Sequence, residues 1–520
     1  MANTRGIIAA GHTATAQAAE SILREGGNAF DAVLAALATA CVAEPVLASL
    51  GGGGFLVAQP AGGVARVYDF FVHTPRRQRP VAELDFRPII ADFGTAQQQF
   101  HIGRSAIAVP GVVRGLFEVH RDLGAIPMRE LVLPAVQCAR DGIIVNALQA
   151  YIYSIVGIIY QDSSEARAIY SSPSRPGVLI CEGERLRQPE LADVLETLAI
   201  EGDGLFYRGE IAQSIVRDLR GGGQLTEHDL AAYQVHKRHP LTLRYRGSNL
   251  LANPPPSFGG LLIGFGLKLL ESVDLRAFDF GSAEHVALLA RTLELTAEAR
   301  AEVQGEQDRP FTPTSERLLE PRYLARYRTE LAGRTASRRG TTHMSIMDGK
   351  GNVASLSLSN GEGSGYVVPG TGIMLNNMLG EQDLNPAGFH RWVPDQRMSS
   401  MMAPCIVIAP DGNPMAMGSG GSNRIRTAIL QVLSNLIDFR MDVEQAVDAP
   451  RIHHEAGLLS VEGGFDLTRI APVLDVFPHH QIWPERNLFF GGVHTVVAND
   501  GELRGAGDPR RGGVCLVVNG

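Results

Sequence analysis

A switch in side-chain periodicity near residue 340 constrains the fold of this chain more than any other feature. Before it, residues 331–340 (LAGRTASRRG) are small, polar and basic, which is typical of an exposed connecting segment. After it, residues 341–347 and 353–359 alternate with period two, and the sequence DGKGN at 348–352 separates them. Such alternation on either side of a turn predicts a β-hairpin. A strand-rich third of the chain therefore follows directly on an exposed segment.

The residues before this switch are predicted to be mainly helical. Residues 13–43 carry apolar side chains at helical spacing, interrupted at Gly26-Gly27, and Asn28 is placed to cap the second helix. A glycine-rich apolar strand is expected at 50–59, and residues 111–330 are mostly helical in pattern. Later elements expected are strands at 403–409, 415–419 and 514–519 and a helix at 425–439. Strands that follow a helical beginning predict sheets covered by helices in one α/β body.

Composition narrows the class of protein. With 520 residues, 45% of them apolar and 20% charged, the chain resembles an ordinary soluble globular protein with a large core. A net charge of −8 without a basic run gives no reason to expect nucleic acid as a partner. The five cysteines are scattered without a C-x-x-C pair, so they predict neither a disulfide framework nor a zinc site. We expect them to be small buried apolar residues.

The beginning of the chain bears on where the protein resides. It lacks the charged start and apolar stretch of a secretory signal. The longest apolar run, residues 32–43, reaches only about half of a bilayer span. We therefore expect a cytoplasmic protein without membrane association, or a periplasmic one if a leader has been removed.

Thr341 stands first in the predicted hairpin. A count through the turn about Lys350 places it beside Ser359 on the partner strand. Ser355, Ser357 and Ser359 then share one face, which forms a row of hydroxyl groups that ends beside Thr341. One interpretation is a solvent-facing strand rich in serine and threonine. The alternative is a catalytic site.

The catalytic interpretation needs a base for the threonine hydroxyl. Cleavage of the Gly340–Thr341 bond would give Thr341 an α-amino group, whose pKa of about 7.7–8 is close to neutral pH. A base on the same residue as the hydroxyl is an economical means of activation. Gly340 would tolerate the strained backbone that an N-to-O acyl shift requires. The hypothesis is a chain that cuts itself before Thr341 and then uses that residue as its nucleophile.

A second candidate element is the sequence GSGGS at Gly418–Ser422, between an apolar strand and the helix expected at 425–439. Backbone N–H groups in such a turn can converge on an anion, helped by the helix N-terminus. Gly420 and Gly421 would then form an oxyanion hole, although a plain strand-to-helix connection is the alternative. The glycines at 51–54 lack the lysine and hydroxyl of a phosphate-binding loop, so no nucleotide is expected there.

Other polar motifs give weaker indications. Ser399-Ser400 offers two hydroxyl groups to a carboxylate, although such a pair is more typical of a turn. His453-His454 and His479-His480 are adjacent pairs that regular structure cannot aim at one ion, so neither a metal nor a cofactor is expected. Asp508–Arg511 is predicted to be a turn with solvated charges.

Ten short motifs, in their order and spacing, resemble the γ-glutamyltransferase family of N-terminal-nucleophile hydrolases. They are Glu25–Ala29, Leu50–Phe55, Val109–Gly111, Pro254–Gly260, Thr341–His343, Leu375–Asn377, Arg397–Ser400, Gly418–Ser422, Asp448–Arg451 and Asp508–Arg510. The resemblance covers nearly the whole chain and implies a four-layer αββα sandwich. It also implies a precursor that is cleaved into a large subunit, residues 1–340, and a small subunit, residues 341–520, within one body.

The resemblance assigns roles residue by residue. The residues concerned are Thr341 as nucleophile with its own amine as base, Ser359 as its supporting hydroxyl, Gly420 and Gly421 as the oxyanion pair, Ser399 and Ser400 for a glutamyl α-carboxylate, and Glu381 for the α-ammonium group. The partners implied are a small amide substrate, an amine or peptide acceptor, and the two fragments of the precursor.

Three positions depart from the family pattern. Phe71 stands where the family has an arginine that grips the α-carboxylate, a loss of about 1.5–3 kcal/mol per charged hydrogen bond. Arg76 or Arg77 is a candidate replacement. Met378 and Gly361 stand where polar residues are common. These changes leave the nucleophile intact but weaken the prediction of glutamyl specificity.

Three functions remain open on the sequence. The first is a γ-glutamyltransferase-like amidase that forms an acyl-enzyme, released by water or by an amine. The second is a related acylase for glutaryl or other small carboxylated amides, which Phe71 favours and Glu381 disfavours. The third is an uncleaved, catalytically silent relative that only binds. A denaturing gel and a substrate panel separate the three.

Overall fold

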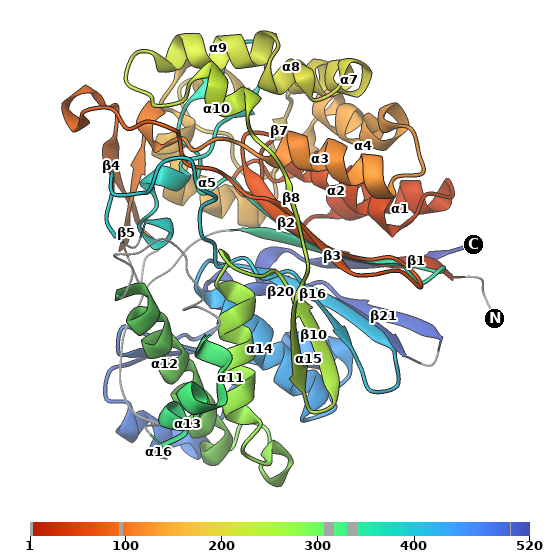
Figure 1. Cartoon of the computed structure of the whole chain (residues 1–520), viewed down its shortest axis with the longest axis vertical. Helices are drawn as coiled ribbons and strands as arrows, with labels where there is room; N and C mark the ends of the chain where they lie inside the picture. The colour runs from red at the N-terminus through yellow and green to blue at the C-terminus, as the bar shows by residue number, and fades with distance from the viewer. Residues whose placement is uncertain (1–3, 93–96, 306–316, 330–340, 386, 500) are drawn as a thin grey trace.

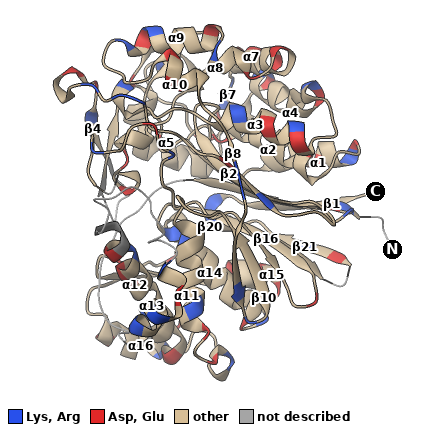
Figure 2. Cartoon of the chain, viewed as in Figure 1, with Lys and Arg blue, Asp and Glu red and all other residues tan. Residues whose placement is uncertain are grey.

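The computed structural model describes the chain except for residues 1–3, 93–96, 306–316, 330–340, 386 and 500. Two β-sheets lie face to face in the middle of the molecule, and helices cover the outer face of each sheet (Figure 1). This is the four-layer αββα arrangement that the family resemblance implied. Acidic and basic residues are intermixed along the outer helices (Figure 2).

The first sheet has seven strands and contains the predicted hairpin at its centre. Its order is β22 (Val514–Asn519), β1 (Thr4–Ala10), β11 (Thr342–Asp348), β12 (Val353–Ser359), β2 (Gly53–Gln59), β3 (Arg66–Phe70) and β8 (His236–Arg238). All neighbouring strands in it are antiparallel. Strands from the beginning, middle and end of the chain therefore alternate within one sheet.

The second sheet has six strands, and its strand β16 contacts β11 and β12 of the first sheet. Its order is β21 (Glu502–Ala506), β20 (Gly492–Asn499), β16 (Pro414–Gly420), β15 (Cys405–Ile408), β10 (Ser248–Ala252) and β9 (Leu241–Tyr245). The remaining described strands form separate small sheets. Three of these sheets have two strands: β4 (Arg87–Asp92) with β5 (Gln97–Ile102), β6 (Ile143–Ile144) with β7 (Arg185–Leu186), and β13 (Val367–Val368) with β14 (Ile373–Met374). The fourth has three strands, β17 (Ile452–Glu455), β18 (Leu458–Val461) and β19 (His480–Ile482).

The helical layer over the seven-stranded sheet is centred on α2. All residues of α2 (Ala29–Ala43) are buried, because the helix contacts β11 and β12 on one side and α1, α3 and α4 on the others. As predicted, Asn28 caps it, and Asp31 completes a capping box. The other helices of this half are α1 (Thr13–Arg24), α3 (Val112–Leu123), α4 (Met128–Asp141), α5 (Ala147–Tyr160), α6 (Ser164–Tyr170), α7 (Pro189–Glu201), α8 (Gly204–Tyr207), α9 (Glu210–Leu219) and α10 (Glu227–Ala231).

The helical layer over the six-stranded sheet is built around α14, which contacts β16 and β20. Its helices are α11 (Gly259–Leu270), α12 (Ala283–Gly305), α13 (Pro321–Thr329), α14 (Arg424–Ile437), α15 (Val443–Asp448) and α16 (Leu467–Val476). Among the described helices, none combines the length and the apolar character needed to cross a bilayer.

Three apolar layers hold the sandwich together. The middle layer, between the sheets, includes Ile7, Val57, Met347, Ile406 and Val496, and each outer layer joins one sheet to its helices.

The cysteines follow the sequence prediction of burial only in part. All five are free thiols, two of them fully inside the protein and three only partly buried.

Candidate active site

Thr341 lies immediately before β11 and is 3% exposed. The β11–β12 register pairs Thr342 with Leu358, so the next pair in the same register is Thr341 with Ser359. The hairpin count from the sequence therefore gave the right neighbour. Gly340, on the other side of the predicted cleavage junction, is outside the described residues.

The hydroxyl row beside Thr341 faces the second sheet. The ring of His343 lies between the Ser345 and Ser357 hydroxyls, each 2.9 Å from one ring nitrogen, and Ser355 Oγ donates to the Met417 carbonyl of β16 at 3.0 Å. Burial lowers the pKa of His343, so its ring is neutral. The solvent-facing interpretation of this strand is therefore wrong, because the second sheet covers the face on which these side chains lie.

The predicted oxyanion loop lies directly against Thr341. Strand β16 ends at Gly420, and a Cβ added there would overlap the carbonyl oxygen of Thr341. Gly421 and Ser422 follow with φ angles of +117° and +50°, a left-handed conformation that is uncommon for serine. Ser422 Oγ donates to Asp383 Oδ2 at 2.8 Å, which anchors the loop. The loop also precedes α14, whose N-terminus favours negative charge.

Ser359 and Glu381 meet in the same corner of the molecule. Ser359 Oγ accepts a hydrogen bond from Gly361 N at 3.0 Å. A Cβ on Gly361 would lie 2.7 Å from Glu381 Oε1 and would overlap Asn377 Oδ1. The glycine at position 361 therefore leaves the space that the Glu381 carboxylate, 5% exposed, occupies. The structure brings Ser359 and Glu381 together at the Thr341 end of the hairpin.

Ser399 and Ser400 lie on a segment that runs toward α11. The Ser400 carbonyl accepts hydrogen bonds from Ser257 Oγ at 3.0 Å and from Phe258 N at 2.8 Å. Ser400 Oγ accepts a hydrogen bond from Met402 N at 3.0 Å, and Ser400 is buried whereas Ser399 is half-buried. These contacts fix the segment, and carboxylate binding by the pair stays a prediction.

Phe71 stands where the family resemblance led us to expect an arginine. It is 1% exposed, and its ring stacks on Phe55 at a centroid distance of 5.3 Å. Met378, the second departure from the family pattern, belongs to the same apolar cluster, together with Met398. Both positions therefore hold a buried apolar side chain where the family resemblance led us to expect a polar one.

Arg397, whose guanidinium reaches the Phe71 backbone, is occupied by internal contacts. Arg397 donates to the Phe71 carbonyl, pairs with Asp69 at 3.2 Å and lies over the Tyr233 ring, 4.8 Å from its centroid. Its guanidinium therefore supports the end of β3 instead of offering its charge to a ligand.

The two replacements suggested by the sequence do not point to a carboxylate grip either. Arg76 pairs with Asp395 at 2.8 Å, and both side chains are more than a third exposed. Arg77 is exposed on the surface. Neither side chain has a described contact that directs its charge toward Phe71.

The turn at Asp508–Arg511 is buried, so the prediction of solvated charges is wrong. Asp508 pairs with Arg451 at 2.6 Å and with Arg510 at 3.3 Å, and Arg510 also pairs with Glu462 at 2.6 Å. All four side chains are at most 1% exposed. Burial alone would raise the pKa of Asp508, but Arg451 and Arg510 lower it to about 2. The sequence signal that indicates this network is the pair of family motifs that supply Arg451 and Asp508-Pro-Arg510.

Two further residues lie near the candidate nucleophile, where the sequence analysis did not place them. Arg511 Nη1 donates to the Thr341 carbonyl oxygen at 3.5 Å. Glu44, at the C-terminal end of α2, accepts hydrogen bonds from Thr342 Oγ1 and Thr15 Oγ1, both at 2.7 Å. Glu44 is 3% exposed, so a buried carboxylate supports the residue next to Thr341. Arg511 directly follows the Asp508–Arg510 motif but was predicted to be solvated, and Glu44 has no local sequence pattern that would identify it.

Comparison with known proteins agrees with this geometry. A family model described as gamma-glutamyltranspeptidase matches residues 15–518. The chain belongs to the gamma-glutamyltranspeptidase family. The glutathione hydrolase proenzyme of Escherichia coli (strain K12) is 31% identical, over 97% of this chain and 90% of that protein. The acylase ACY 1 proenzyme of Pseudomonas sp. (strain SE83) is 30% identical, over 99% of this chain and 94% of that protein.

The same family likeness extends to solved structures. The crystal structure of cephalosporin acylase from Bacillus halodurans has a TM-score of 0.84 and 25% identity, over 99% of this chain and 96% of that one. This gamma-glutamyltranspeptidase family member is therefore an enzyme of the N-terminal-nucleophile hydrolase type, as predicted from its motifs. Its relatives include both glutathione hydrolases and acylases.

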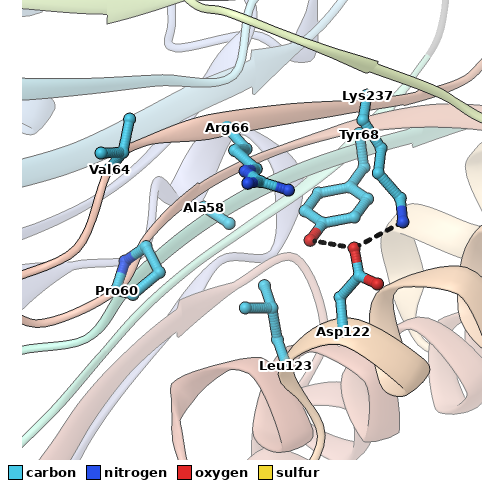
Figure 3. Close-up of a pocket in the computed structure, with 8 residues that line it drawn as sticks. All are labelled: Ala58, Pro60, Val64, Arg66, Tyr68, Asp122, Leu123 and Lys237. Atoms are coloured by element: carbon cyan, nitrogen blue, oxygen red, sulfur yellow. Dashed lines mark hydrogen bonds and ion pairs between the residues drawn. The ribbon is translucent and has the colours of Figure 1, made fainter.

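A cavity of about 470 Å³ lies apart from this site (Figure 3). It is lined by Ala58, Pro60, Val64, Arg66, Tyr68, Asp122, Leu123 and Lys237. Along β12, Ala354 pairs with Ala58 and Ser359 pairs with Gly53, so the cavity is at the opposite end of β2 from the Thr341 corner. None of its lining residues is a predicted site residue of this gamma-glutamyltranspeptidase family member.

In the described part of the chain, no group of three or more His, Cys, Asp or Glu side chains is placed to hold a metal ion.

Proposed function

We propose that this chain cleaves itself between Gly340 and Thr341 and then acts as an amidase or acyltransferase with Thr341 as its nucleophile. The observation that carries the proposal is the contact between the Thr341 carbonyl and Gly420, which sets the candidate nucleophile against a loop suited to an oxyanion. Ser359 as the next partner in the hairpin register supports it further. The proenzyme relatives support a maturing cleavage.

Maturation uses the hydroxyl before the amine exists. Thr341 Oγ attacks the carbonyl carbon of Gly340, the C–N bond breaks, and the acyl group moves to oxygen while the nitrogen takes a proton. Water then hydrolyses the ester and releases the new carboxyl end of residues 1–340 and the new amino end of residues 341–520. The buried surroundings of Thr341 hold the reacting atoms in place.

Turnover uses the same hydroxyl with the new amine as base. Thr341 Oγ attacks the substrate amide carbon while the α-amine accepts the hydroxyl proton. Backbone N–H groups of Gly420 and Gly421 stabilise the oxyanion of the tetrahedral intermediate. The α-ammonium group then protonates the leaving amine and leaves an acyl ester on Thr341. Water or an acceptor amine attacks that ester, and the α-amine again takes and returns the proton.

Two acyl groups are candidates for the substrate of this enzyme. Glu381 favours a γ-glutamyl or similar amide, because a buried carboxylate would bind the α-ammonium group. The second candidate is a glutaryl or other small carboxylated amide, which has no ammonium group for Glu381 to bind. The acylase relatives match this chain as extensively as the glutathione hydrolase does, which supports keeping both.

One experiment tests the cleavage and the chemistry together. On a denaturing gel, the wild type should give two fragments, and Thr341→Ala should give one full-length band. The purified wild type is then assayed with matched γ-glutamyl and glutaryl p-nitroanilides, which share the same leaving group. Reaction of the glutaryl compound alone would exclude the glutamyl assignment. A single band and no activity from the wild type would support a silent binding relative and overturn the proposal.

A further inference from the structure

The guanidinium group of Arg511 lies between Thr341 and the oxyanion loop. Its Nη1 donates to the Thr341 carbonyl oxygen at 3.5 Å. Ideal Cβ positions on Gly420 and Gly421 would each lie 3.2 Å from one of its terminal nitrogens. One planar charged group, the Arg511 guanidinium, therefore contacts both the proposed nucleophile and the proposed oxyanion loop.

This charge is poorly compensated for a buried arginine. Arg511 is 6% exposed, and among the residues that the structure describes Nη2 donates only to the Leu488 carbonyl, at 3.3 Å. Within the described chain, its Nε has no hydrogen-bond partner, and no carboxylate lies within ion-pair distance of its guanidinium. Burial lowers its pKa to about 10 against the attraction of Glu362 and Asp508. The neighbouring Arg510, by contrast, has two carboxylate partners.

An uncompensated buried cation costs stability, so the presence of one at this place calls for a functional reason. The Thr341 amine, once formed, would be three bonds from the carbonyl oxygen that Arg511 contacts. A nearby positive charge disfavours the protonated form of an amine. Only an unprotonated amine can accept the hydroxyl proton.

We propose that Arg511 is a positioning residue for the nucleophile, which holds Thr341 by its carbonyl and keeps the amine created by cleavage unprotonated at neutral pH. This inference rests on the proposed function and adds a residue to it. The effect of Arg511 on the amine is confined to the mature enzyme, because this amine does not exist in the uncut chain.

Other ionisable groups also surround this end of β11. They are Glu44, His343, Glu362, Glu381, Asp383, Arg424, His494 and Asp508. Burial lowers the pKa of both histidines, to about 4 for His494, so neither imidazole carries charge at neutral pH. The carboxylates oppose the effect of Arg511 on the amine. A substitution of Arg511 alone leaves all of these groups in place, so the change in protonation reports the guanidinium.

The test compares pH profiles of kcat/KM for mature wild type, R511Q and R511K. The acid limb of the wild type reports protonation of the essential base. In R511Q this limb should move up by about one pH unit, the size expected for the loss of a nearby charge. At pH 7 kcat should therefore fall several-fold with little change in KM, and the loss should be recovered at higher pH. R511K keeps the charge and should restore most of the wild-type profile.

The matched control is R504Q. Arg504 lies on β21, is 63% exposed and pairs with Glu502, so its replacement should leave the profile unchanged. An acid limb of R511Q that coincides with that of the wild type would overturn the proposal. Failure of both R511Q and R511K to cleave would overturn it too, since the role would then precede the amine. An uncut, inactive wild type would instead refute the proposed function itself.

Discussion

The carbonyl oxygen of Thr341 lies so close to the Cα of Gly420 that no side chain fits between them. The first residue of the proposed small fragment and the last residue of β16 are therefore held at one fixed separation. Because a displacement of about 1 Å can cost roughly 100-fold in rate, this contact sets the precision of the proposed site.

Gly420→Ala tests that contact. The new methyl group would overlap the Thr341 carbonyl, and backbone on both sides would have to move. We expect slowed or absent cleavage, and a kcat at least about 100-fold lower in any mature fraction. Gly204→Ala is the control, because its Cβ would meet open space at the start of α8. Normal cleavage and turnover by Gly420→Ala would show that the loop does not need this close approach.

Glu381→Gln tests recognition of the substrate ammonium group. The change keeps the side-chain shape but removes the charge, so kcat/KM for γ-glutamyl anilide should fall by about 10- to 100-fold. The value for the matched glutaryl anilide should change little, because that acyl group has no ammonium. Asp411→Asn, on the exposed turn between β15 and β16, serves as the charge-matched control. Equal losses on both anilides would mean that Glu381 supports the fold of the site instead.

Glu44→Gln tests the buried carboxylate behind Thr342. An amide can accept only one of the two hydroxyl hydrogen bonds and brings an unmatched N–H group, so we expect a loss of about 1–3 kcal/mol in stability. Thermal unfolding of wild type and variant measures it. Glu20→Gln removes a partly exposed pair with Arg24 and should cost less than about 1 kcal/mol. If the two variants lost the same stability, the hydrogen bonds to Glu44 would contribute no more to stability than a partly exposed ion pair does.

Asp508 should make stability depend on pH in the acid range. Its pKa is lowered from 3.8 to about 2 in the folded chain, so the folded state binds a proton less readily than the unfolded chain. That contribution, about 2 kcal/mol, is complete above the unfolded pKa and is lost as pH falls from about 4 toward 2. In Asp508→Asn this part of the acid dependence should disappear, and stability at neutral pH should fall by about 3–5 kcal/mol. Thermal midpoints measured across the acid range would contradict this if both proteins showed the same slope.

The sequence was informative where neighbours in the chain are also neighbours in space. The hairpin of β11 and β12 follows from local alternation and a turn, which is why the pairing of Thr341 with Ser359 could be counted. The same count could not show which face is covered, because β16 lies some 60 residues further along the chain and its position depends on the tertiary fold.

The remaining part of the site could not be predicted, since it depends on contacts between distant segments. Glu44 and Thr342 are separated by 298 residues, and Arg511 and Thr341 by 170. The turn at Asp508–Arg511 was misjudged for the same reason. Three charges in four residues usually indicate solvent exposure, and the partners that make burial possible, Arg451 and Glu462, lie on other elements.

The order of strands in the seven-stranded sheet has a consequence for the two products of a cut before Thr341. From one edge, strands of the second product alternate with strands of the first: β22, then β1, then β11 and β12, then β2. Each product would therefore lack the hydrogen-bonding neighbours of its own central strands if the other were removed. The pair should behave as a single folding unit whose activity does not fall on dilution, and whose halves, once unfolded, must refold together.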